Sequence, residues 1–359
     1  MDLLQEARKI INDVDAQMAD LFVQRMKAAE MVAQYKQAHG MPIQDPEREE
    51  AVVRNGSARV EDETLRGYYT DFMRDTMAIS RRYQHRLMNG MKVAYSGTEG
   101  AFGYIAAHKL FPDGEKVAYG DFKSAYDSVV NGDCDAVVLP LENSYAGEVG
   151  QVTDLMFSGP LYVNHVLPLS ITHNLLTVEG ATMDSIKTVV SHPQALSQCE
   201  DFISDHGYQQ ISYANTALAA KYVAELNDPT VAAIASLESA EKFGLQVLVE
   251  GINQSQVNTT RFAVLSRSEN RNVGKQHGAH FILVFTVRNE AGALAQALNI
   301  IGLYDFNMRT LRSRPMHELL WQYYFYVEAE GNIHSSDGER MLKELAVCCD
   351  KIKCVGSFT

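Results

Sequence analysis

The sequence predicts a multidomain protein in which an all-α bundle is followed by an α/β region and then by a small α+β region. Its 359 residues exceed the usual length of one domain. Apolar residues keep a helical three-four spacing up to about residue 89, strands and helices then alternate, and strands dominate the last part. The polar segments "MNGMK" and "RSENRNVGKQHG" are typical of joints. We therefore expect domains at residues 1–89, 91–270 and 279–359.

The composition narrows the possible partners and the compartment. A formal net charge of -13 argues against nucleic acid or an anionic membrane surface as the main partner, so any bound anion must be held by a local cluster of donors. The five cysteines form no CxxC pair and are odd in number, which is typical of reduced thiols in a cytoplasmic protein. No export signal and no run of about eighteen apolar residues is evident.

The first region reads as three helices, at about residues 3–39, 46–55 and 63–89. The long first helix carries a coiled-coil-like apolar seam in which Arg25 takes the place of an apolar residue. Lys36 follows eleven residues later, on nearly the same helical face. A salt bridge to a neighbouring helix would account for Arg25 alone, whereas a small dianion held between the two cations would account for both.

Polar residues also mark the second and third helices. Asp45 before Pro46 is a strong N-cap signal, and Glu49 in the first turn suits the helix dipole, but Arg48 does not. Ser80 and Gln84 interrupt the apolar stripe of the third helix. Such residues can be satisfied within a core, or can bind ligand oxygens inside the bundle.

In this order and spacing, the polar positions of residues 3–88 resemble the all-helical chorismate mutases. Their reaction is an intramolecular pericyclic rearrangement that needs no nucleophile, only a folded dianion and donors for the breaking ether oxygen. The resemblance implies that Lys36 and Gln84 are catalytic. It also implies eight chorismate-binding residues: Arg8, Arg25, Lys36, Asp45, Arg48, Glu49, Ser80 and Gln84.

Arg8 cannot reach the same ligand as Arg25 within one chain. The two residues are seventeen positions apart on one helix, or about 25 Å. If Arg8 acts, it must come from a second copy of the long helix. We therefore expect a homodimer, or a tetramer, in which the mutase site is shared between chains.

The middle region begins with a strand and the glycine-rich turn of Gly97, Gly100 and Gly103. Their GxxGxxG spacing differs from the dinucleotide GxGxxG, and no Walker loop follows, so neither NAD nor ATP is expected. The glycines could let backbone N–H groups approach a carboxylate at a helix start.

Three polar clusters then accompany buried strands. One strand is expected to end at Pro140, before a loop with Glu142, Asn143 and Ser144; another ends at Ser191, before a helix that projects Gln198; a third begins at Thr260 and Arg261. Singly, each cluster suits turn, capping or strand chemistry. Polar residues beyond the carboxyl ends of strands are also where open α/β sheets bind ligands.

The motifs "LENSYAG", "SHPQALSQ" and "NTTRF" together resemble prephenate dehydratase over residues 91 to about 270. The resemblance implies a two-lobed, periplasmic-binding-like domain in which Thr260 is the catalytic donor to the leaving hydroxyl, a poor leaving group without a proton or strong hydrogen bond. Ala101 and Gly103 stand where many members of that family have hydroxyl residues, which makes the affinity for the substrate, rather than the reaction type, open to change. No metal or cofactor is expected. The implied prephenate-binding residues are Glu142, Asn143, Ser144, Ser191, Gln198, Thr260 and Arg261, the last fixing a carboxylate.

The tail is expected to run strand (280–287), helix (292–302), strand, strand (319–331), helix (336–347), strand, which is the ferredoxin-like order βαββαβ. With "EAGALAQALNIIG" and "RSRP" it resembles an ACT domain that binds phenylalanine. Arg312 stands where that family usually has glutamate, which would change effector affinity or identity. A plain dimerisation module is the alternative. The implied effector-binding residues are Gly292, Ala293, Leu294, Ser313, Arg314 and Pro315.

These resemblances together imply the family of bifunctional chorismate mutase-prephenate dehydratases. Such a protein takes chorismate through prephenate to phenylpyruvate under feedback inhibition by phenylalanine. One alternative is a dehydratase whose helical segment only dimerises. Another is a non-catalytic sensor of aromatic amino acids, in which Thr260 and Lys36 would have no purpose.

Overall fold

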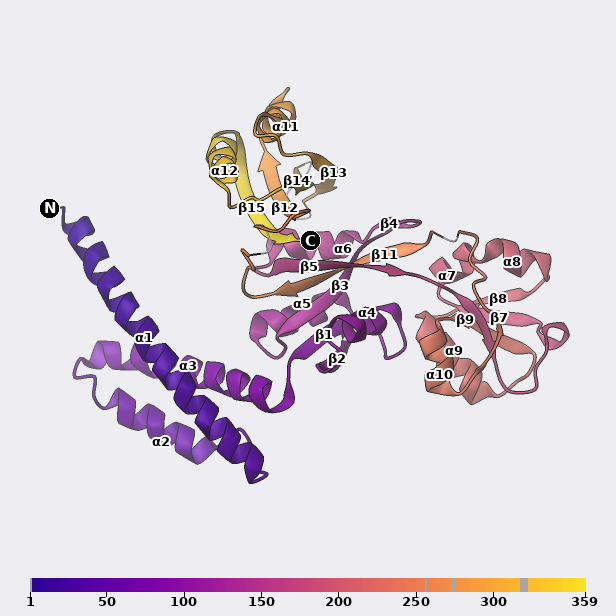
Figure 1. Cartoon of the computed structure of the whole chain (residues 1–359), viewed down its shortest axis with the longest axis horizontal. Coiled ribbons are helices and arrows are strands. Elements are labelled where there is room, and N and C mark those ends of the chain that lie inside the picture. The colour runs from indigo at the N-terminus through magenta and orange to yellow at the C-terminus, as the bar shows by residue number, and fades with distance from the viewer. Residues whose placement is uncertain (1, 256, 273–274, 317–321) are drawn as a thin grey trace. The chain divides into compact units, whose positions relative to one another are not determined.

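The computed structural model describes residues 2–255, 257–272, 275–316 and 322–359 (Figure 1). The chain divides into two compact units. A helical unit comprises the residues up to Met91 together with Asp113–Glu115, and a larger unit comprises Lys92–Pro112 and Lys116–Thr359. In the part of the chain that the structure describes, no helix is both long and apolar enough to cross a membrane.

The helical unit contains α1 (Leu3–Ala38), α2 (Pro46–Ser57) and α3 (Glu63–Asn89). Each helix begins at an aspartate whose carboxylate accepts a backbone N–H, as expected for an N-cap. Both α1 and α2 pack on α3. The helix expected at 46–55 extends to Ser57 because the Ser57 hydroxyl is buried against α3, 2.7 Å from that of Thr70. The expected bundle of three helices is confirmed.

Two β-sheets form the framework of the larger unit (Figure 1). The first has the order β13-β14-β12-β15-β5-β11-β3-β1-β2, with β4 beside β3, and the second has the order β10-β6-β9-β7-β8. The strands are β1 (Lys92–Ser96), β2 (Glu115–Tyr119), β3 (Ala136–Asn143), β4 (Gly147–Glu148), β5 (Tyr162–Ser170), β6 (Asn174–Thr177), β7 (Thr188–Ser191), β8 (Gln209–Ser212), β9 (Val231–Ala235), β10 (Gln246–Val249), β11 (Thr259–Ser266), β12 (His280–Val287), β13 (Met308–Pro315), β14 (Tyr323–Glu330) and β15 (Cys349–Phe358).

Helices bury each sheet in a separate apolar core. In the first sheet, Val137 and Leu139 of β3 pack with Met156 and Leu265, and in the second Val189 and Ile234 occupy the centre of another cluster. Central strands covered on both faces read as continuous apolar runs, which is why these segments were recognisable in the sequence. The helices are α4 (Phe102–Leu110), α5 (Phe122–Asn131), α6 (Gly150–Ser158), α7 (Pro193–Gln198), α8 (Glu200–Asp205), α9 (Thr216–Leu226), α10 (Leu237–Phe243), α11 (Ala293–Leu303) and α12 (Ser336–Cys348), with a short 3₁₀ turn at Met183–Ser185.

The chain crosses between the two sheets twice, and the described residues of these crossovers are 171–173 after β5, and 250–255 and 257–258 before β11. The two crossovers are hydrogen-bonded to each other. Ile171 N–H donates to the Asn258 carbonyl at 2.7 Å, and Ile252 N–H donates to the His173 carbonyl at 2.9 Å. This double link positions the side chains that face the space between the sheets.

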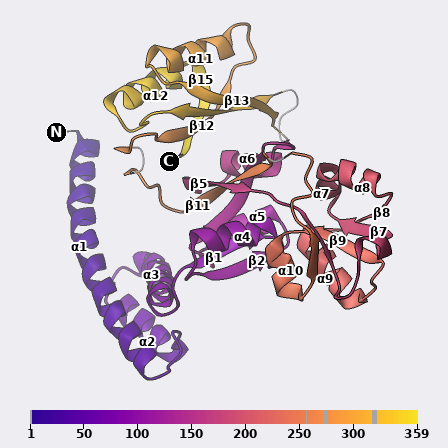
Figure 2. The same cartoon turned by 45° about the vertical axis from the view of Figure 1, so that its right-hand side comes forward.

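The tail has the expected order, β12-α11-β13-β14-α12-β15, and both of its helices lie on one face of its strands (Figure 2). The strand expected at 319–331 is observed as β14 from Tyr323, and residues 319–321 of that expectation lie outside the described residues. Gly356 of β15 pairs with Val163 of β5 and joins the tail to the middle sheet. A side chain at position 356 would collide with the Val163 backbone, so the junction requires glycine.

One expected boundary is wrong, and the difference matters for the site. The strand expected to end at Pro140 continues to Asn143, because β11 pairs beyond Pro140. Thr260 pairs with Asn143 and Arg261 with Glu142, with a register shift between Arg261 and Phe262. Glu142 and Asn143 are therefore strand residues whose side chains point to opposite faces.

Candidate active sites

A cleft of about 590 Å³ is lined by residues from both sheets of the larger unit. Its volume lies within the range of small-molecule sites. Asn143 of β3 and Thr260 of β11 enter it from the first sheet, and Gln198 of α7 enters it from the second. Asn215 and Thr216 line it at the start of α9.

The start of α4 gives the cleft backbone donors. Gly97, Ala101 and Gly103 line the wall, and the N-cap residue Ala101 makes no side-chain hydrogen bond to the N–H groups of the helix. A Cβ at position 103 would lie 2.8 Å from the Ser96 carbonyl oxygen, so glycine is needed there and no hydroxyl can replace it. An uncapped helix start is suited to an anionic group.

The cleft is poor in charged side chains. Among the lining residues that the structure describes, Glu148 carries a carboxylate and none carries a guanidinium or ammonium group. His173 and His192 also line the cleft, and burial lowers the pKa of both, which favours neutral imidazoles near neutral pH. Backbone N–H groups, amides and hydroxyls are thus the donors available to a ligand.

Thr260 and Asn143 form a buried hydrogen-bonded pair. The Asn143 Nδ2 donates to the Thr260 Oγ1 at 2.9 Å. The other end of the amide, Oδ1, accepts the backbone N–H groups of Tyr145 and Ala146, each at 2.9 Å. Sequence patterns could not give this contact, which arises from the register between β3 and β11.

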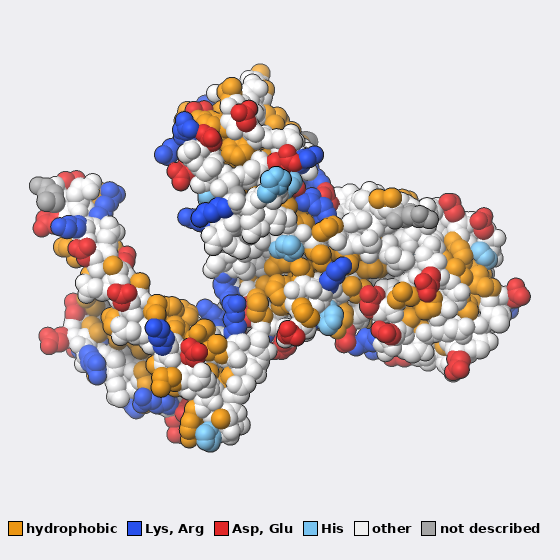
Figure 3. Space-filling view, in the orientation of Figure 1, with side chains coloured by type: hydrophobic (Ala, Val, Ile, Leu, Met, Phe, Trp, Pro, Cys, Tyr) orange, Lys and Arg blue, Asp and Glu red, His pale blue; other side chains and the backbone are white. Residues whose placement is uncertain are grey.

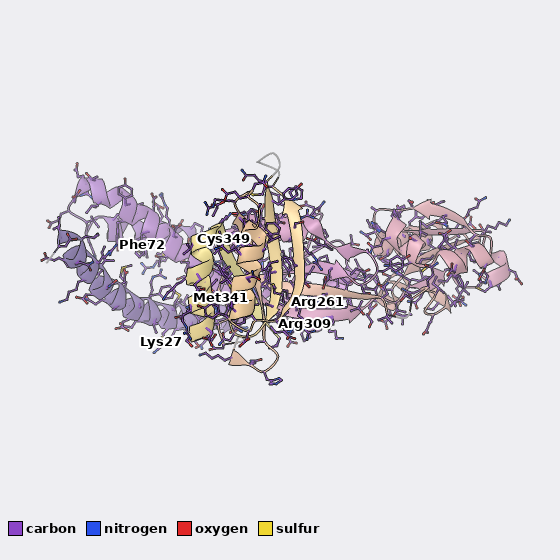
Figure 4. All side chains as sticks on the ribbon, turned by 90° about the horizontal axis from the view of Figure 1, so that it is seen from above. Lys27, Phe72, Arg261, Arg309, Met341 and Cys349 are labelled. Atoms are coloured by element: carbon purple, nitrogen blue, oxygen red, sulfur yellow. The ribbon has the colours of Figure 1, made fainter. Side chains whose placement is uncertain are left out.

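Arg261 and Glu142 lie on the opposite face of the same strands. Arg261 Nη1 donates to Glu142 Oε1 at 2.6 Å, and its two terminal nitrogens reach the carboxylate of Glu328 in β14, each at 3.0 Å. Arg312 of β13 also bonds to Glu142. Arg261 is therefore beside the strands of the tail, as the labelled side chain shows in Figure 4.

Two of the expected site residues bond to the backbone. The Ser144 hydroxyl donates to the Val257 carbonyl at 2.8 Å, and the Ser191 hydroxyl donates to the Ile234 carbonyl at 2.5 Å. Of the seven residues expected to bind prephenate, the structure brings Asn143, Gln198 and Thr260 to the cleft. The remaining four are absent from its described lining: Glu142, Ser144, Ser191 and Arg261.

The sequence analysis missed the cleft-lining residue His173, and it gave no role to Asn258, the first residue of the motif "NTTRF". His173 follows β5 at the first crossover, and Asn258 precedes β11 at the second. Both are buried, with exposed fractions of 2% and 4%. A polar residue beside a buried apolar run, as in "ITHNLL", was the available signal, but by itself that pattern is equally typical of a satisfied core residue.

In the tail, the residues expected to bind an effector lie on two elements. Gly292 caps α11 in a left-handed conformation (φ 87°), and Ala293 and Leu294 follow it. Arg314 of β13 makes a bidentate ion pair with Asp154 of α6, at 2.9 and 2.8 Å. Ser313 and Pro315, on the other face of β13, are exposed.

In the helical unit, Arg25 is the residue most clearly directed into the bundle. It bonds to the Ser80 hydroxyl and lies 3.2 Å from the Met77 sulfur, and its partial burial lowers the pKa of the guanidinium. Gln84 is buried, and its Oε1 has no partner among the described residues. The structure thus brings together Arg25 and Ser80.

The other expected mutase residues have separate surroundings. Lys36 Nζ donates to the Ile43 carbonyl at 2.5 Å, and Glu49 pairs with Arg81. Asp45 accepts the Arg48 N–H at 3.1 Å, as an N-cap. Arg8 and Arg48 are exposed.

Comparisons with known proteins match both regions of the chain. The family model described as chorismate mutase type II matches residues 7–85, and the one described as prephenate dehydratase matches residues 93–270. The bifunctional chorismate mutase/prephenate dehydratases of Enterobacter agglomerans and Neisseria gonorrhoeae are 31% and 30% identical to this chain. These matches cover 98% and 99% of this chain, and 94% and 97% of theirs.

A solved structure shares the fold of the larger unit. It is a prephenate dehydratase from Arthrobacter aurescens in complex with L-Phe, with a TM-score of 0.68 and 24% sequence identity. The match covers 75% of this chain and 89% of that one.

The pairing of Glu142 predicts a defined acid sensitivity. Burial alone would raise the pKa of this carboxyl, but Arg261 and Arg312 more than offset this effect and hold the pKa below its ordinary value. A lowered folded-state pKa means that the stabilisation is present above the unfolded pKa of about 4.3 and is lost as the pH falls through the folded value. Glu142→Gln should therefore lower the urea midpoint at pH 7, and the difference from the native chain should shrink below about pH 4.

Exposed Glu179 offers a matched control, since Glu179→Gln makes the same chemical change on the surface. It should move the midpoint little at either pH. A Glu142→Gln difference that grows on acidification would contradict the assignment of a lowered pKa.

Proposed function

The chain belongs to the bifunctional chorismate mutase/prephenate dehydratases, and from this premise we propose which of its residues perform the two reactions. It is an enzyme that rearranges chorismate to prephenate and converts prephenate to phenylpyruvate. One observation supports the dehydratase assignment above the others. The Thr260 hydroxyl lines the cleft while its oxygen accepts a hydrogen bond from Asn143, so its own hydrogen is available to a ligand.

The dehydratase reaction needs a donor at one atom of the substrate. The ring carboxylate leaves as carbon dioxide, its bonding pair enters the ring, and the C4 hydroxyl departs with the pair of its own C–O bond. Departing hydroxide must be stabilised by a hydrogen bond or a proton. Thr260 supplies the hydrogen bond. A neutral hydroxyl is a weak acid, so aromatisation and decarboxylation provide the driving force and the protein provides placement.

The substrate carboxylates meet backbone and amide donors rather than Arg261. Arg261 is held by two carboxylates on the face of β11 opposite to Thr260, which supports a role in joining β11 and β3 to the tail. The uncapped start of α4 and the Gln198 amide are the donors that line the cleft. Water-excluded donors of this kind stabilise anions without bringing a mobile cation into the site.

The mutase site is assigned to the interior of the helical unit. Arg25 would hold a carboxylate of chorismate, while Lys36 and Gln84 would face the ether oxygen on which negative charge develops. The unpartnered Oε1 of buried Gln84 supports a ligand there, since buried polar atoms normally have partners.

A second copy of the chain is the proposed partner of α1. Along its first half Leu4, Ile11, Met18 and Leu21 are between 44% and 62% exposed, and the buried residues of α1 are Ala29 and Ala33 in the second half. Hydrophobic side chains are visible along this unit in Figure 3. An apolar seam of this length on an isolated helix would be unstable in water. Pairing with another α1 would cover it and would bring in Arg8.

We propose the tail as an ACT domain that binds phenylalanine at the start of α11. The left-handed Gly292 lets the chain turn sharply into the helix, and no side chain caps the N–H groups of the first turn. Those beyond Ala293, whose N–H donates to the Glu290 carbonyl, would bind the carboxylate of an amino acid. Arg314 is assigned to the contact with Asp154, through which β13 touches the middle region.

The test of the dehydratase assignment uses two neighbouring threonines. Thr260→Val keeps the side-chain shape but removes the donor, and should lower dehydratase kcat by about 10²- to 10⁴-fold. Supplied with chorismate, the variant should accumulate prephenate, because the mutase site lies in the other unit. Thr259→Val is the matched control, since strand alternation places Thr259 on the other face. Loss of phenylpyruvate formation in Thr259→Val but not in Thr260→Val would show that the donor is Thr259 and not Thr260.

Chain sharing at the mutase site can be tested by mixing inactive variants. An equal mixture of Arg8→Ala and Arg25→Ala chains should recover about a quarter of native mutase activity, because half of the dimers are hybrids and each hybrid has one intact site. Arg25→Ala mixed with Lys36→Ala is the control. Both of those residues come from the same chain at each site, so every site keeps one defect. Equal activity of the two mixtures after verified exchange would contradict the shared site.

The effector site can be tested at two glycines of the tail. Gly292→Ala places a side chain at a φ that disfavours it, and the resulting strain at the start of α11 should raise the phenylalanine concentration for half-inhibition of the dehydratase by at least about 5-fold. Gly302→Ala, near the C-terminal end of the same helix and with open space around it, should leave inhibition unchanged. Identical inhibition curves for the two variants would place the effector elsewhere.

A further inference from the structure

Five buried polar side chains form a continuous hydrogen-bonded chain from one wall of the cleft to the other. Thr260 and Asn143 belong to the first sheet, and Gln198 belongs to α7 beside the second sheet. The link between them runs through residues of the two crossovers. The five residues are Asn143, His173, Gln198, Asn258 and Thr260, with exposed fractions between 2% and 8%.

The direction of the first hydrogen bonds is set by the backbone. The Asn143 Oδ1 accepts from two backbone N–H groups, which can only donate, so the other end of this amide must be the NH₂ group. That group donates to the Thr260 Oγ1 at 2.9 Å and to the Asn258 Oδ1 at 2.8 Å. Thr260 therefore accepts from inside the protein, and its own hydrogen has no acceptor among the described residues.

The orientation of the Asn143 amide also determines the orientations of the Asn258 and Gln198 amides. Because the Asn258 Oδ1 is an acceptor, its Nδ2 is the donor and contacts the Gln198 Oε1 at 3.0 Å. The same oxygen lies 2.8 Å from the Nε2 of His173. A carbonyl oxygen can only accept, so His173 carries its hydrogen on Nε2. The Gln198 Nε2 is left buried and without a partner among the described residues, and Gln198 is one of the residues that line the cleft.

His173 is held so that it can make this contact. Its ring packs edge-on against Phe102 of α4, with centroids 5.6 Å apart. Its backbone N–H donates to the Asn253 side chain at 2.7 Å, which ties the first crossover to the second. Burial lowers the pKa of the imidazole, and the Nδ1 has no partner among the described residues. This nitrogen is thus a bare acceptor.

We propose that His173 and Asn258 are positioning residues of the dehydratase, which fix the Gln198 amide so that its NH₂ group, like the Thr260 hydroxyl, donates into the cleft. The proposal rests on the dehydratase function stated above. Its physical basis is that a freely rotating amide would present oxygen as readily as nitrogen, and an amide oxygen facing a substrate carboxylate or hydroxyl oxygen would repel it. Two donors on one acceptor oxygen exclude that orientation.

The chain also depends on how the two lobes are placed. His173 and Asn258 lie on the crossovers, and Gln254 N–H of the second crossover donates to the Gln198 carbonyl at 2.9 Å. The orientations of Thr260 and Gln198, on opposite walls of the cleft, consequently depend on the position of the crossovers. A change in the crossovers would disturb the orientation of Gln198 before it altered either sheet.

Activity measurements can separate positioning from packing. His173→Leu removes the donor to Gln198 and should lower dehydratase kcat/KM about 10- to 100-fold. This range corresponds to the free-energy cost of a buried polar group that has lost its partner. His173→Gln keeps an N–H donor near the same place and should recover most of that loss. In a Gln198→Leu background, His173→Leu should have little further effect, because the two residues act through one contact. Additive losses, or a His173→Gln variant as poor as His173→Leu, would overturn the proposal.

Asn258→Asp gives an independent test. The new carboxylate still accepts from Asn143 but has no hydrogen for the Gln198 oxygen, so the amide should turn and present its oxygen to the cleft. KM for prephenate should then rise at least about 10-fold, with mutase activity unchanged. Asn131→Asp makes the same chemical change at an exposed position at the end of α5, away from the crossovers and from the five residues, and should affect KM much less. An equal effect of both substitutions would show that the charge, not the polarity of Gln198, is responsible.

A spectroscopic measurement tests the geometry without turnover. In the full chain labelled with ¹⁵N-histidine, the ring nitrogens of His173 should show the neutral tautomer with hydrogen on Nε2, assigned by its loss in His173→Gln. Hydrogen on Nδ1, or a charged ring at pH 7, would overturn the proposed direction of the hydrogen bonds. The tautomer could be as expected while the native chain makes no phenylpyruvate from prephenate. In that case the proposed dehydratase function is wrong, whereas the direction of the hydrogen bonds among the five residues is correct.

Discussion

The register between β3 and β11 is the constraint on which the larger unit depends. Pairing Thr260 with Asn143 and Arg261 with Glu142 places one pair on the cleft face and the other on the face toward the tail. A slip of one residue would exchange the two faces, moving a guanidinium and a carboxylate into the cleft and the hydroxyl away from it. The binding site and the contact with the tail are therefore specified by the same four residues. A change in the register between β3 and β11 would therefore disturb both the cleft and the contact with the tail.

This arrangement leaves no guanidinium or ammonium group among the described residues that line the cleft. The arginines of the larger unit that the motifs drew attention to are paired with carboxylates between the middle region and the tail. Isolated cations in the cleft would have carried a desolvation penalty. The cleft instead presents a helix start, amides and a hydroxyl, whose orientation is set by hydrogen bonds to the backbone and to one another. In the proposed site, the placement of neutral donors therefore takes the part that charged side chains would otherwise have.

The tail meets the middle region through contacts next to the site. Arg312 bonds to Glu142, whose neighbour Asn143 holds Thr260, and Arg314 bonds to Asp154 in the helix that follows the cleft residue Val149. Arg312 adds a second positive charge beside Glu142, which Arg261 already contacts. A glutamate at position 312 would instead face a like charge. β13 is thus in direct contact with the strand that carries Asn143.

Much of this protein was determined locally and could be predicted from its sequence. N-capping aspartates, three-four apolar spacing and continuous buried strands depend on residues close together in the chain, so the three helices and the order of the tail were evident without a structure. Asn143, Gln198 and Thr260 were also singled out from the sequence, and all three line the cleft. The tertiary structure decided how those residues are used. Strand pairing between segments more than a hundred residues apart took Arg261 and Glu142 out of the cleft, and the two crossovers joined His173 and Asn258 to Gln198 through hydrogen bonds that the sequence did not indicate. Such contacts depend on register and on the two crossovers, and no short stretch of sequence contains that information.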